Sequence, residues 1–476
     1  MKQNCLTLSG NIMFLMLVSS VLLASGAFAQ GPHIKDFSVF GTGLQLGTSS
    51  TVVSGNVGSM SIVRTTGTSS IGGSIYSKGL IDLANSNTVT GSVYAANDPF
   101  VAGNAFQTGS NASIAGSIFA NGPIYVGGGS VNGSVELTSN SFSYSGPTPS
   151  GTVTVNPALT FPMPTLPGTF SIPAIPANKP DIVNNTTLLP YNGTDATKYG
   201  NIMLGGARTV TFSAPGTYII RSIRNSGNFN KFVFNFTSAP SGIFKLYLPG
   251  DVDLFKINVE LVGGGSPSQI YMEVQGNGQS AGGTGYAWSI TNGASGNNQS
   301  TWLGTVWAPN GPISVGSGSS QSKIIGALWS HMQVDIQNGV SITHAALQQC
   351  NFTVDAGSDP TITCASLTPQ LSGSTTALNP VYSWTTSDGI IVSGANTANP
   401  VISKAGTYTL TVTSPGCFDS YSDNVVVTTI PCVLPFYPPS TPGKVDLKIG
   451  SELWSLYNNY GNVLDDGSSM FTIMNG

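Results

Sequence analysis

A short phrase centred on glycine recurs five times between residues 53 and 135, and this repeat restricts the possible fold more than any other feature. It reads apolar, any residue, Gly, polar, apolar, as in Val89–Val93 and Ile114–Ile118. The central glycines lie at positions 55, 73, 91, 116 and 133, so their spacing is nearly constant except for one longer step. Residues i, i+2 and i+4 of a strand share one face, so each phrase places two branched side chains and the glycine on the inner side.

This period predicts a β-solenoid over residues 30–146. About 18 residues, at about 3.3 Å each, can close on themselves as one turn of a parallel β-helix. Stacked turns then bury a continuous apolar column that no single turn could bury alone. Glycine lets two backbones approach closely at a narrow bend. The longer step, from Gly91 to Gly116, contains Asn97–Phe100, which we expect to form a loop that bulges from one turn.

The repeat resumes after a proline-rich interval. Ten prolines fall between Pro147 and Pro190, and proline removes donors from a β-ladder, so residues 147–195 are predicted to be a linker or a strap along the solenoid. Residues 304–315 then resemble residues 118–126 in sequence. We therefore expect residues 196–349 to form a second solenoid part, which can join the first in one longer stack.

The sequence pattern changes at residues 350–432 to short predicted strands separated by turns. This spacing is typical of an immunoglobulin-like β-sandwich. Trp384 and Tyr408 are its core candidates. The mature chain's cysteines all fall here, and an even number in an exported module predicts disulfides. We expect Cys364–Cys417 to link the sheets and Cys350–Cys432 to join the ends, although four cysteines allow three pairings. Residues 433–476 are predicted to be a linker and the start of a possibly truncated module.

The first 29 residues have the layout of a secretory signal peptide. Lys2 precedes an apolar stretch at 12–23, and Ala27-Phe28-Ala29 offers small residues for cleavage. The stretch is shorter than a membrane span requires, and no later segment is long and apolar enough. Only 8% of residues are charged, against about 25% in ordinary domains. The formal net charge of −4 argues against a nucleic-acid partner. A secreted protein of the cell surface is predicted.

Two family resemblances accompany these patterns. The phrase Gly304–Val315, with its Val-Trp-Ala-Pro-Asn core, resembles choice-of-anchor A and collagen-binding-like domains of bacterial surface proteins, and Gly116–Val126 is also similar to bactofilin-type solenoids. Residues 382–384 and 406–412 resemble an immunoglobulin-like domain of the PKD type, with a departure in the turn after Trp384. These resemblances imply a non-catalytic β-helix with an adhesive or scaffolding role, followed by a spacer module.

The titratable residues do not form a catalytic or metal-binding pattern. His331 and His344 lie thirteen residues apart with no Asp or Cys at ligand spacing, and His33 lies near the predicted mature N-terminus. A polysaccharide-active β-helix enzyme needs paired carboxylates. The carboxylates of the first half are scattered, at Asp36, Asp82, Asp98 and Glu136. We expect no enzyme activity, no metal and no cofactor.

Recognition of an extracellular glycan or a matrix protein is the function predicted first. Five aromatic residues of the solenoid could contact such a ligand, or could equally belong to the core: Tyr94, Phe119, Tyr125, Trp307 and Trp329. The alternative is binding of ice or another flat surface by hydroxyl groups. Thr65, Thr66, Thr68, Thr88 and Thr90 indicate a hydroxyl-rich solenoid, but no Thr-x-Thr phrase repeats at the period of the turns.

Overall fold

The computed structural model describes residues 32–98, 103–279, 284–291, 300–317, 322–348, 352–363, 366–377, 380–413 and 421–430, with the backbone of three later strands. The chain divides into two compact units, the first ending at Gln348 and the second beginning at Gln349. The predicted signal peptide and all four cysteines of the predicted disulfides lie outside the described residues, so both stay predictions. Within the described part, no helix is long and apolar enough to span a membrane.

The first unit is a parallel β-helix in two arms. The first arm (residues 37–155) contains β1 (Phe37–Leu46), β2 (Thr51–Val52), β3 (Asn56–Thr65), β4 (Ser70–Ile71), β5 (Ile75–Ser77), β6 (Ile81–Leu83), β7 (Thr88–Val89), β8 (Val93–Ala95), β9 (Phe106–Thr108), β10 (Ala112–Ile114), β11 (Ile118–Ala120), β12 (Ile124–Val126), β13 (Gly129–Val131), β14 (Val135–Leu137), β15 (Tyr144–Ser145) and β16 (Val153–Val155). Each strand pairs in parallel with a strand of the next turn, as β5 does with β8 and β8 with β11.

The second arm (residues 186–344) continues the same architecture with longer turns. Its strands are β17 (Thr186–Leu188), β18 (Lys198–Leu204), β19 (Thr209–Phe212), β20 (Gly216–Asn225), β21 (Asn230–Asn235), β22 (Phe244–Leu248), β23 (Val252–Phe255), β24 (Ile257–Val262), β25 (Ile270–Val274), β26 (Trp288–Thr291), β27 (Thr301–Ala308), β28 (Ile313–Val315), β29 (Lys323–Ser330), β30 (Gln333–Ile336) and β31 (Ser341–His344). Short 3-10 turns occur at η1 (Ile34–Asp36), η2 (Asp195–Thr197) and η3 (Pro267–Gln269).

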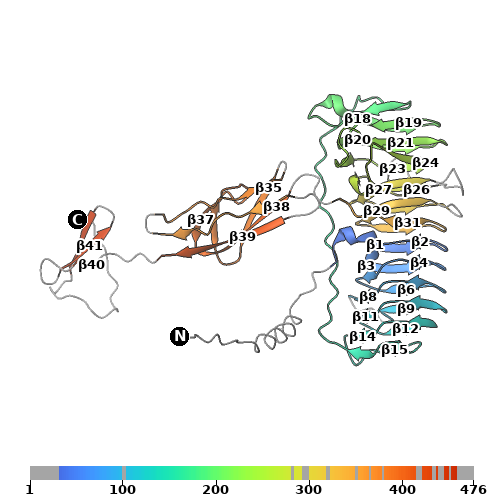
Figure 1. Ribbon diagram of the computed structural model, residues 1–476, viewed down its shortest axis with the longest axis horizontal. Helices are drawn as coiled ribbons and strands as arrows, with labels where there is room; N and C mark the ends of the chain where they lie inside the picture. Colours follow the sequence, from blue (N-terminus) through green and yellow to red (C-terminus); the bar gives the residue numbers. More distant parts are fainter. Residues whose placement is uncertain are drawn as a thin grey trace, which may run out of the picture. The chain divides into compact units, whose positions relative to one another are not determined.

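The two arms join edge to edge at a seam between the first strands of the unit and its last strands. Strand β1 pairs in parallel with both β29 and β30, and β2 pairs with β31. Figure 1 shows the start of the first arm directly beside the end of the second. The arms therefore form one stack, as the similarity of their repeats predicts.

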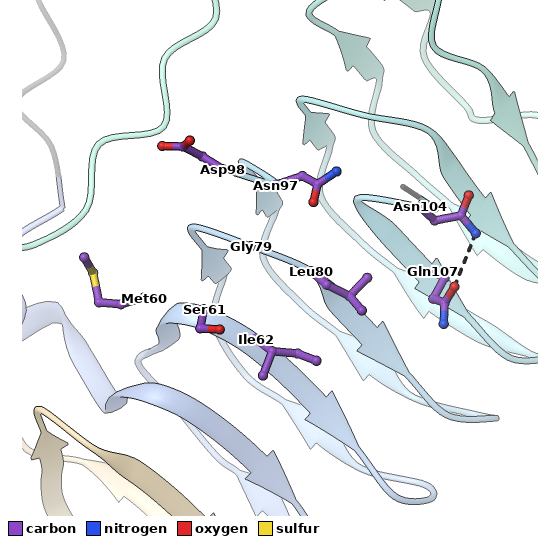
Figure 2. Close-up of a pocket in the computed structure, with 10 residues that line it drawn as sticks. Met60, Ser61, Ile62, Gly79, Leu80, Asn97, Asp98, Asn104 and Gln107 are labelled. Carbon is purple, nitrogen blue, oxygen red and sulfur yellow. Dashed lines mark hydrogen bonds between the residues drawn. The ribbon is translucent and has the colours of Figure 1, made fainter. Parts of the chain in front are cut away.

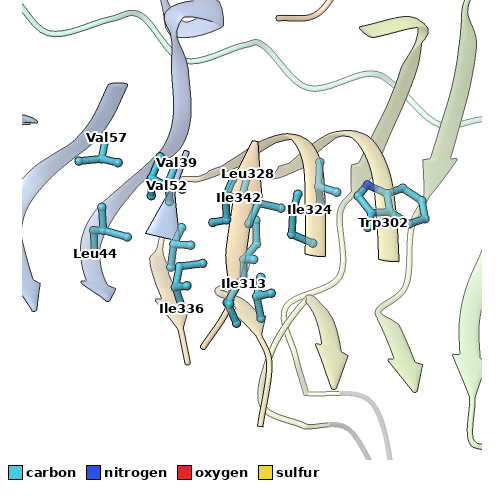
Figure 3. Close-up of a cluster of buried hydrophobic side chains, with 14 of the residues drawn as sticks. Val39, Leu44, Val52, Val57, Trp302, Ile313, Ile324, Leu328, Ile336 and Ile342 are labelled. Carbon is cyan, nitrogen blue, oxygen red and sulfur yellow. The ribbon is translucent and has the colours of Figure 1, made fainter. Parts of the chain in front are cut away.

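One apolar core runs through both arms. At the seam, Val39, Val52 and Val57 from the first arm and Leu328 and Ile342 from the second are at most 1% exposed. Figure 3 shows these side chains gathered in one cluster. Burying a branched aliphatic side chain of this size stabilises a fold by about 1.5–3 kcal/mol, so the inward columns hold the turns together.

The Gly-Ser pair of the repeat has a structural reason that the strand pattern did not predict. A Cβ added to Gly116 would lie 2.5 Å from the carbonyl oxygen of Gly91 in the preceding turn, so it would point along the stack and not into the core. The serine after each glycine closes the same corner. The Oγ of Ser92 accepts from the Ser117 backbone N–H at 3.1 Å, and the Oγ of Ser117 accepts from the Ser134 N–H at 3.0 Å.

The proline-rich segment is a strap that lies along the solenoid (Figure 1). The solenoid strands reach further into the predicted interval of 147–195 than the proline count indicates, because β16 and β17 occupy proline-free stretches inside it. We call residues 156–185 the strap. The aromatic ring of Phe170 stacks on Tyr247 at a centroid distance of 4.0 Å.

The second unit is an immunoglobulin-like β-sandwich. It contains β32 (Val354–Asp355), β33 (Thr361–Ile362), β34 (Ser374–Thr375), β35 (Val381–Thr386), β36 (Ile390–Ser393), β37 (Val401–Lys404), β38 (Gly406–Thr413) and β39 (Tyr421–Thr429). A separate sheet follows with β40 (Phe436–Tyr437), β41 (Lys444–Ile449) and β42 (Glu452–Tyr457). Trp384 and Tyr408 are buried, and the Tyr408 hydroxyl donates to the Lys404 carbonyl at 2.5 Å. A tyrosine bonded to the backbone a few residues upstream is typical of such sandwiches.

Candidate functional site

The outward residues of the β-helix divide into three faces, and the strap covers one of them. We call this the strap face; its outward column in the second arm includes Tyr247, Glu273, Trp307 and Trp329. Trp307 and Trp329 are fully buried, and the indole N–H of Trp329 donates to the Phe37 carbonyl at 3.0 Å. Of the two roles predicted for these tryptophans, their burial inside the folded unit supports the core role and not ligand contact.

The other three predicted aromatics are also not gathered into one site. Tyr94 and Phe119 are half-buried on the strap face of the first arm, where their rings stack at 4.9 Å. Tyr94 also stacks on Tyr76 at 4.5 Å, and burial raises the pKa of Tyr76 to about 12. Tyr125 is 47% exposed on a different face, the one formed by β12 and its neighbours. The structure thus separates the five aromatics into three environments.

A buried carboxylate fixes the strap to the second arm. The Phe170 backbone N–H donates to Oε1 of Glu273 at 2.8 Å, and the Gln275 side-chain amide donates to the same oxygen at 2.6 Å. The Tyr271 hydroxyl donates to Oε2 of Glu273 at 3.1 Å. Removal from water raises the pKa of Glu273, against the opposing effect of these hydrogen bonds. This cluster is a structural clamp, since the strap closes it from outside.

The second face carries charged residues of both signs at several ladder positions. We call it the mixed-charge face; Arg64 pairs with Asp82 at 3.2 Å, and the Gln107 amide donates to Asp82 at 2.9 Å. Further along, the Ser289 hydroxyl donates to Asp253 at 2.9 Å. No cluster of three metal-ligating side chains occurs among the described residues. The carboxylates of this face are spread over separate turns and are bonded to neighbours, which is a pattern of surface ladders.

A hollow of about 450 Å³ opens where the mixed-charge face meets the strap face in the first arm. Figure 2 shows Met60, Leu80 and Gln107 around it. Its polar groups bond mainly to one another and to neighbouring ladders, as Asn104 does with Gln107 at 3.3 Å. The hollow contains no pairing of groups that supports a particular reaction.

The third face carries a column of hydroxyl groups, and we call it the hydroxyl face. Six outward residues align in register across six consecutive turns, without a charged member. They are Ser341, Thr51, Ser70, Thr88, Ser113 and Ser130. We call these six the hydroxyl ladder. The residues that follow each of them, such as Val52 and Val89, are buried, so the hydroxyls are held on a rigid apolar layer.

A second column runs parallel to the ladder, two residues further along each turn. Backbone hydrogen bonds extend the register to these positions, for example from the Thr90 N–H to the Ile71 carbonyl at 2.9 Å. The column consists of small or uncharged residues: Thr343, Val53, Gly72, Thr90, Ala115 and Asn132. Lys323, which pairs with Ser341, ends the uncharged area on the side of the second arm.

The threonines singled out in the sequence lie only partly on this face. Thr88 and Thr90 lie on it. Thr65 does not, because it is 4% exposed and its hydroxyl accepts from the Ala84 N–H of the next turn at 2.7 Å. A Thr-x-Thr phrase does not mark the ladder, because the ladder mixes serine with threonine and has one such residue per strand. The phrase that does recur is Ser or Thr followed by Val or Ile, in strands of two or three residues.

Comparisons with known proteins give structural neighbours only. No protein-family model and no curated protein matches the chain, so the resemblances to choice-of-anchor A and PKD domains stay predictions. One similar structure is an ice-binding protein from an Antarctic biological consortium, with a TM-score of 0.25 and 13% identity over 65% of this chain and 88% of that one. Another is an ice-binding protein of an Antarctic bacterium of the Flavobacteriaceae, with a TM-score of 0.20 and 13% identity over 66% of this chain and 82% of that one.

A third similar structure is one domain of an ice-binding protein from Shewanella frigidimarina, with a TM-score of 0.23 and 12% identity. The match covers 66% of this chain and 98% of that one. At TM-scores this low, the similarity carries no weight for function.

Proposed function

We propose that the protein binds ice through the hydroxyl face of its β-helix. The observation that carries the proposal is the hydroxyl ladder, in which Ser341, Thr51, Ser70, Thr88, Ser113 and Ser130 form one uncharged column in register. A repeating solid surface is matched best by a repeating set of groups. Serine and threonine supply hydroxyls that hydrogen-bond water without the tightly held hydration shell of a charged side chain.

The geometry of a parallel β-helix supports this match. Neighbouring strands lie about 4.8 Å apart, and alternate residues along a strand lie about 6.6 Å apart. The ladder and its parallel column therefore form a rectangular net whose spacing is comparable to repeats between water molecules in ice. The net rests on side chains such as Ile71, Val89 and Ile114, which are 0% exposed. A close-packed layer of this kind holds its outer atoms in place.

The prediction of a glycan or matrix-protein ligand has less support. Two of the five aromatics expected to contact such a ligand, Trp307 and Trp329, are fully buried. On the hydroxyl face of the first arm, small side chains leave no protruding ring on which a sugar could stack. Adhesion to a glycan or matrix protein is kept as the competing outcome of the test below.

The proposed setting is extracellular. The predicted signal peptide would export the chain, and ice forms first in the water outside a cell. The immunoglobulin-like unit would then act as a spacer or as a link to the cell surface, with no catalytic role for either unit. A test is N-terminal sequencing of the protein from a bacterial culture, which should begin at Gln30; an intact Lys2 would contradict export.

The function is tested by ice shaping and thermal hysteresis of the purified protein. We expect the wild type to shape ice crystals and to depress their growth temperature. Thr88→Tyr places a bulky ring in the middle of the ladder, so most of that activity should be lost. The matched control is Gln45→Tyr, which adds the same ring to the mixed-charge face of the same arm, and it should keep the activity.

The outcomes separate the two candidate functions. A wild type without ice activity contradicts the proposal, and saturable binding to a glycan or collagen panel would then restore the adhesin prediction. Equal activity in Thr88→Tyr and the wild type would remove the hydroxyl face from the mechanism. Circular dichroism of each variant checks that the β-helix is intact.

A further inference from the structure

One corner of the second arm holds three residues other than glycine in the left-handed backbone conformation, and two of them are bulky. At the turn from the mixed-charge face to the hydroxyl face, Ala207, Phe229 and Lys256 have φ angles of 50°, 63° and 47°. The strand registers Thr209↔Lys231 and Asn230↔Ile257 place these three residues side by side on consecutive turns. Left-handed φ is unusual for any residue other than glycine, and for a bulky residue it is an outlier.

The first arm makes the same corner with different residues. There, the left-handed position is occupied by Ser49, Ser86 and Asn111, with φ angles of 59°, 57° and 59°. Asparagine is enriched in this conformation, and small polar residues bond to the nearby backbone in turns. Because the fold can be closed with Ser or Asn, the fold alone does not require Phe229 and Lys256 in the second arm.

Burial does not compensate for the strain at Phe229, whose side chain is 69% exposed. Residues held in such sparsely populated backbone conformations cluster at functional sites. The ring of Phe229 is thus presented to solvent at this corner, between Ala207 of the preceding turn and Lys256 of the following turn.

Two cationic residues, Arg208 and Lys256, occupy the same corner as Phe229, on the preceding and the following turn. Arg208 follows Ala207 and is exposed, and the Lys256 ammonium lies 5.2 Å from the centre of the Phe255 ring. The acidic groups of these turns have partners: Glu260 pairs with Lys231 at 2.6 Å, and Asp253 accepts from Ser289 and lies opposite Arg224. This corner thus has an excess of positive charge, because its four cations outnumber its two carboxylates. The cations are Arg208, Arg224, Lys231 and Lys256, and the carboxylates are Asp253 and Glu260. We call Arg208, Phe229 and Lys256 the cationic corner.

We infer that the cationic corner binds an acidic polysaccharide, that is, a glycan with carboxylate groups along its chain. The exposed ring of Phe229 offers a flat surface for a sugar ring, and Arg208 and Lys256 on either side attract the carboxylates. The two cations lie two turns apart, about 10 Å along the stack. A polymer that runs along the stack can therefore contact all three residues at once.

This site is independent of the proposed ice-binding face, because it uses different residues and a different chemistry. A membrane surface fits it less well, since a single ring with two cations presents little apolar area for insertion. Binding to an anionic membrane is nevertheless the alternative that the experiment must distinguish.

The test is affinity electrophoresis of the full chain in gels that contain alginate, with neutral dextran as reference. We expect alginate, but not dextran, to retard the wild type, with less retardation at higher salt. Phe229→Asn should weaken the interaction several-fold. Arg208→Gln and Lys256→Asn should each weaken it about two- to fivefold, as for exposed charge pairs. Lys78→Gln, which removes one cation from the first arm, should bind as the wild type.

Several results would overturn the inference. These are a wild type that alginate does not retard, corner variants that are retarded as the wild type is, or an effect of Lys78→Gln equal to that of Lys256→Asn. Cosedimentation with anionic phospholipid vesicles without retardation by alginate would assign the corner to membranes instead. Asn suits left-handed backbone, so Phe229→Asn should not lower the thermal midpoint, and lost binding cannot then be attributed to unfolding.

Discussion

The two arms of the β-helix share one core but differ on their outer surfaces. Both turn branched side chains inward, and at the seam Val39 and Leu328 pair in the same ladder. Outward, the hydroxyl ladder, which lies in the first arm except for Ser341, has no charge, whereas the equivalent face further along the second arm carries the ion pair Lys231–Glu260 at 2.6 Å. The inward positions are thus constrained by stacking, and the outward positions are free to diverge toward different surfaces.

The corners of the two arms show the same contrast. In the first arm, Gly116 and its equivalents approach the preceding turn closely, and the following serines bond to the next turn. In the second arm, Gly304 and Gly326 keep the close approach, but Thr305 and Ala327 follow them. The hydroxyl of Thr305 is buried and has no hydrogen-bond partner in the part of the chain that the structure describes.

The largest expected effect concerns the glycines of close approach, compared with a glycine at a more open corner. Gly116→Ala adds a Cβ at 2.5 Å from the Gly91 carbonyl oxygen, so the turns must separate and about 3 kcal/mol of unfolding free energy should be lost. In Gly206→Ala of the second arm, the new Cβ lies 3.5 Å from its nearest neighbour, and stability should stay equal or rise by about 0.5 kcal/mol. Urea unfolding measures both; similar losses would contradict the steric explanation.

A smaller difference is expected for the residue after the glycine. Ser117→Ala leaves the Ser134 N–H without its acceptor and should cost about 1 kcal/mol. Thr305→Val removes a buried hydroxyl that has no partner among the described residues, so stability should be unchanged or slightly higher. Urea unfolding measures both variants. A larger loss of unfolding free energy in Thr305→Val than in Ser117→Ala would contradict this account of the two corners.

The strap should give the second arm a pH dependence. Burial raises the pKa of Glu273 above its ordinary value of 4.5. Because the folded state holds the Glu273 proton more tightly than the unfolded state does, protonation of Glu273 stabilises the fold. This stabilisation is complete below pH 4.5 and is lost as the pH rises through the pKa of the folded state. The unfolding free energy of Glu273→Gln should therefore decline less above pH 4.5 than that of the wild type.

Glu136→Gln is the matched control, because Glu136 occupies the same outward column in the first arm and is only half-buried. The unfolding free energy of Glu136→Gln should decline above pH 4.5 as much as that of the wild type. Thermal unfolding at a series of pH values measures both variants. A decline that is identical in all three proteins would exclude Glu273 as its source.

The smallest effect on stability is expected where the outer surfaces differ. The double variant Lys231→Thr/Glu260→Thr removes an exposed ion pair, which should change the unfolding free energy by less than about 1 kcal/mol. It also makes this part of the second arm resemble the hydroxyl face, so ice shaping should be equal or stronger. Weaker ice shaping with unchanged stability would indicate that the charged pair takes part in the binding.

The sequence by itself determined the fold class and the division of the first unit. The regular spacing of Gly55, Gly73 and Gly91 fixes the length of a turn, and the alternation around these glycines fixes which side chains face the core. The prolines between 147 and 190 marked the strap, although its ends were misplaced. The spacing of short strands near Trp384 and Tyr408 predicted the sandwich.

Only the tertiary structure decided which outward residues become neighbours. An alternating pattern identifies two sides of a strand, but it gives neither the register with the next turn nor the segment that covers a side. Trp307 has the alternation of a surface residue and is buried nonetheless in the packed unit. The ladder that joins Thr51 to Ser341 connects the two ends of the first unit's sequence. The seam creates that contact by stacking, and no local pattern contains it.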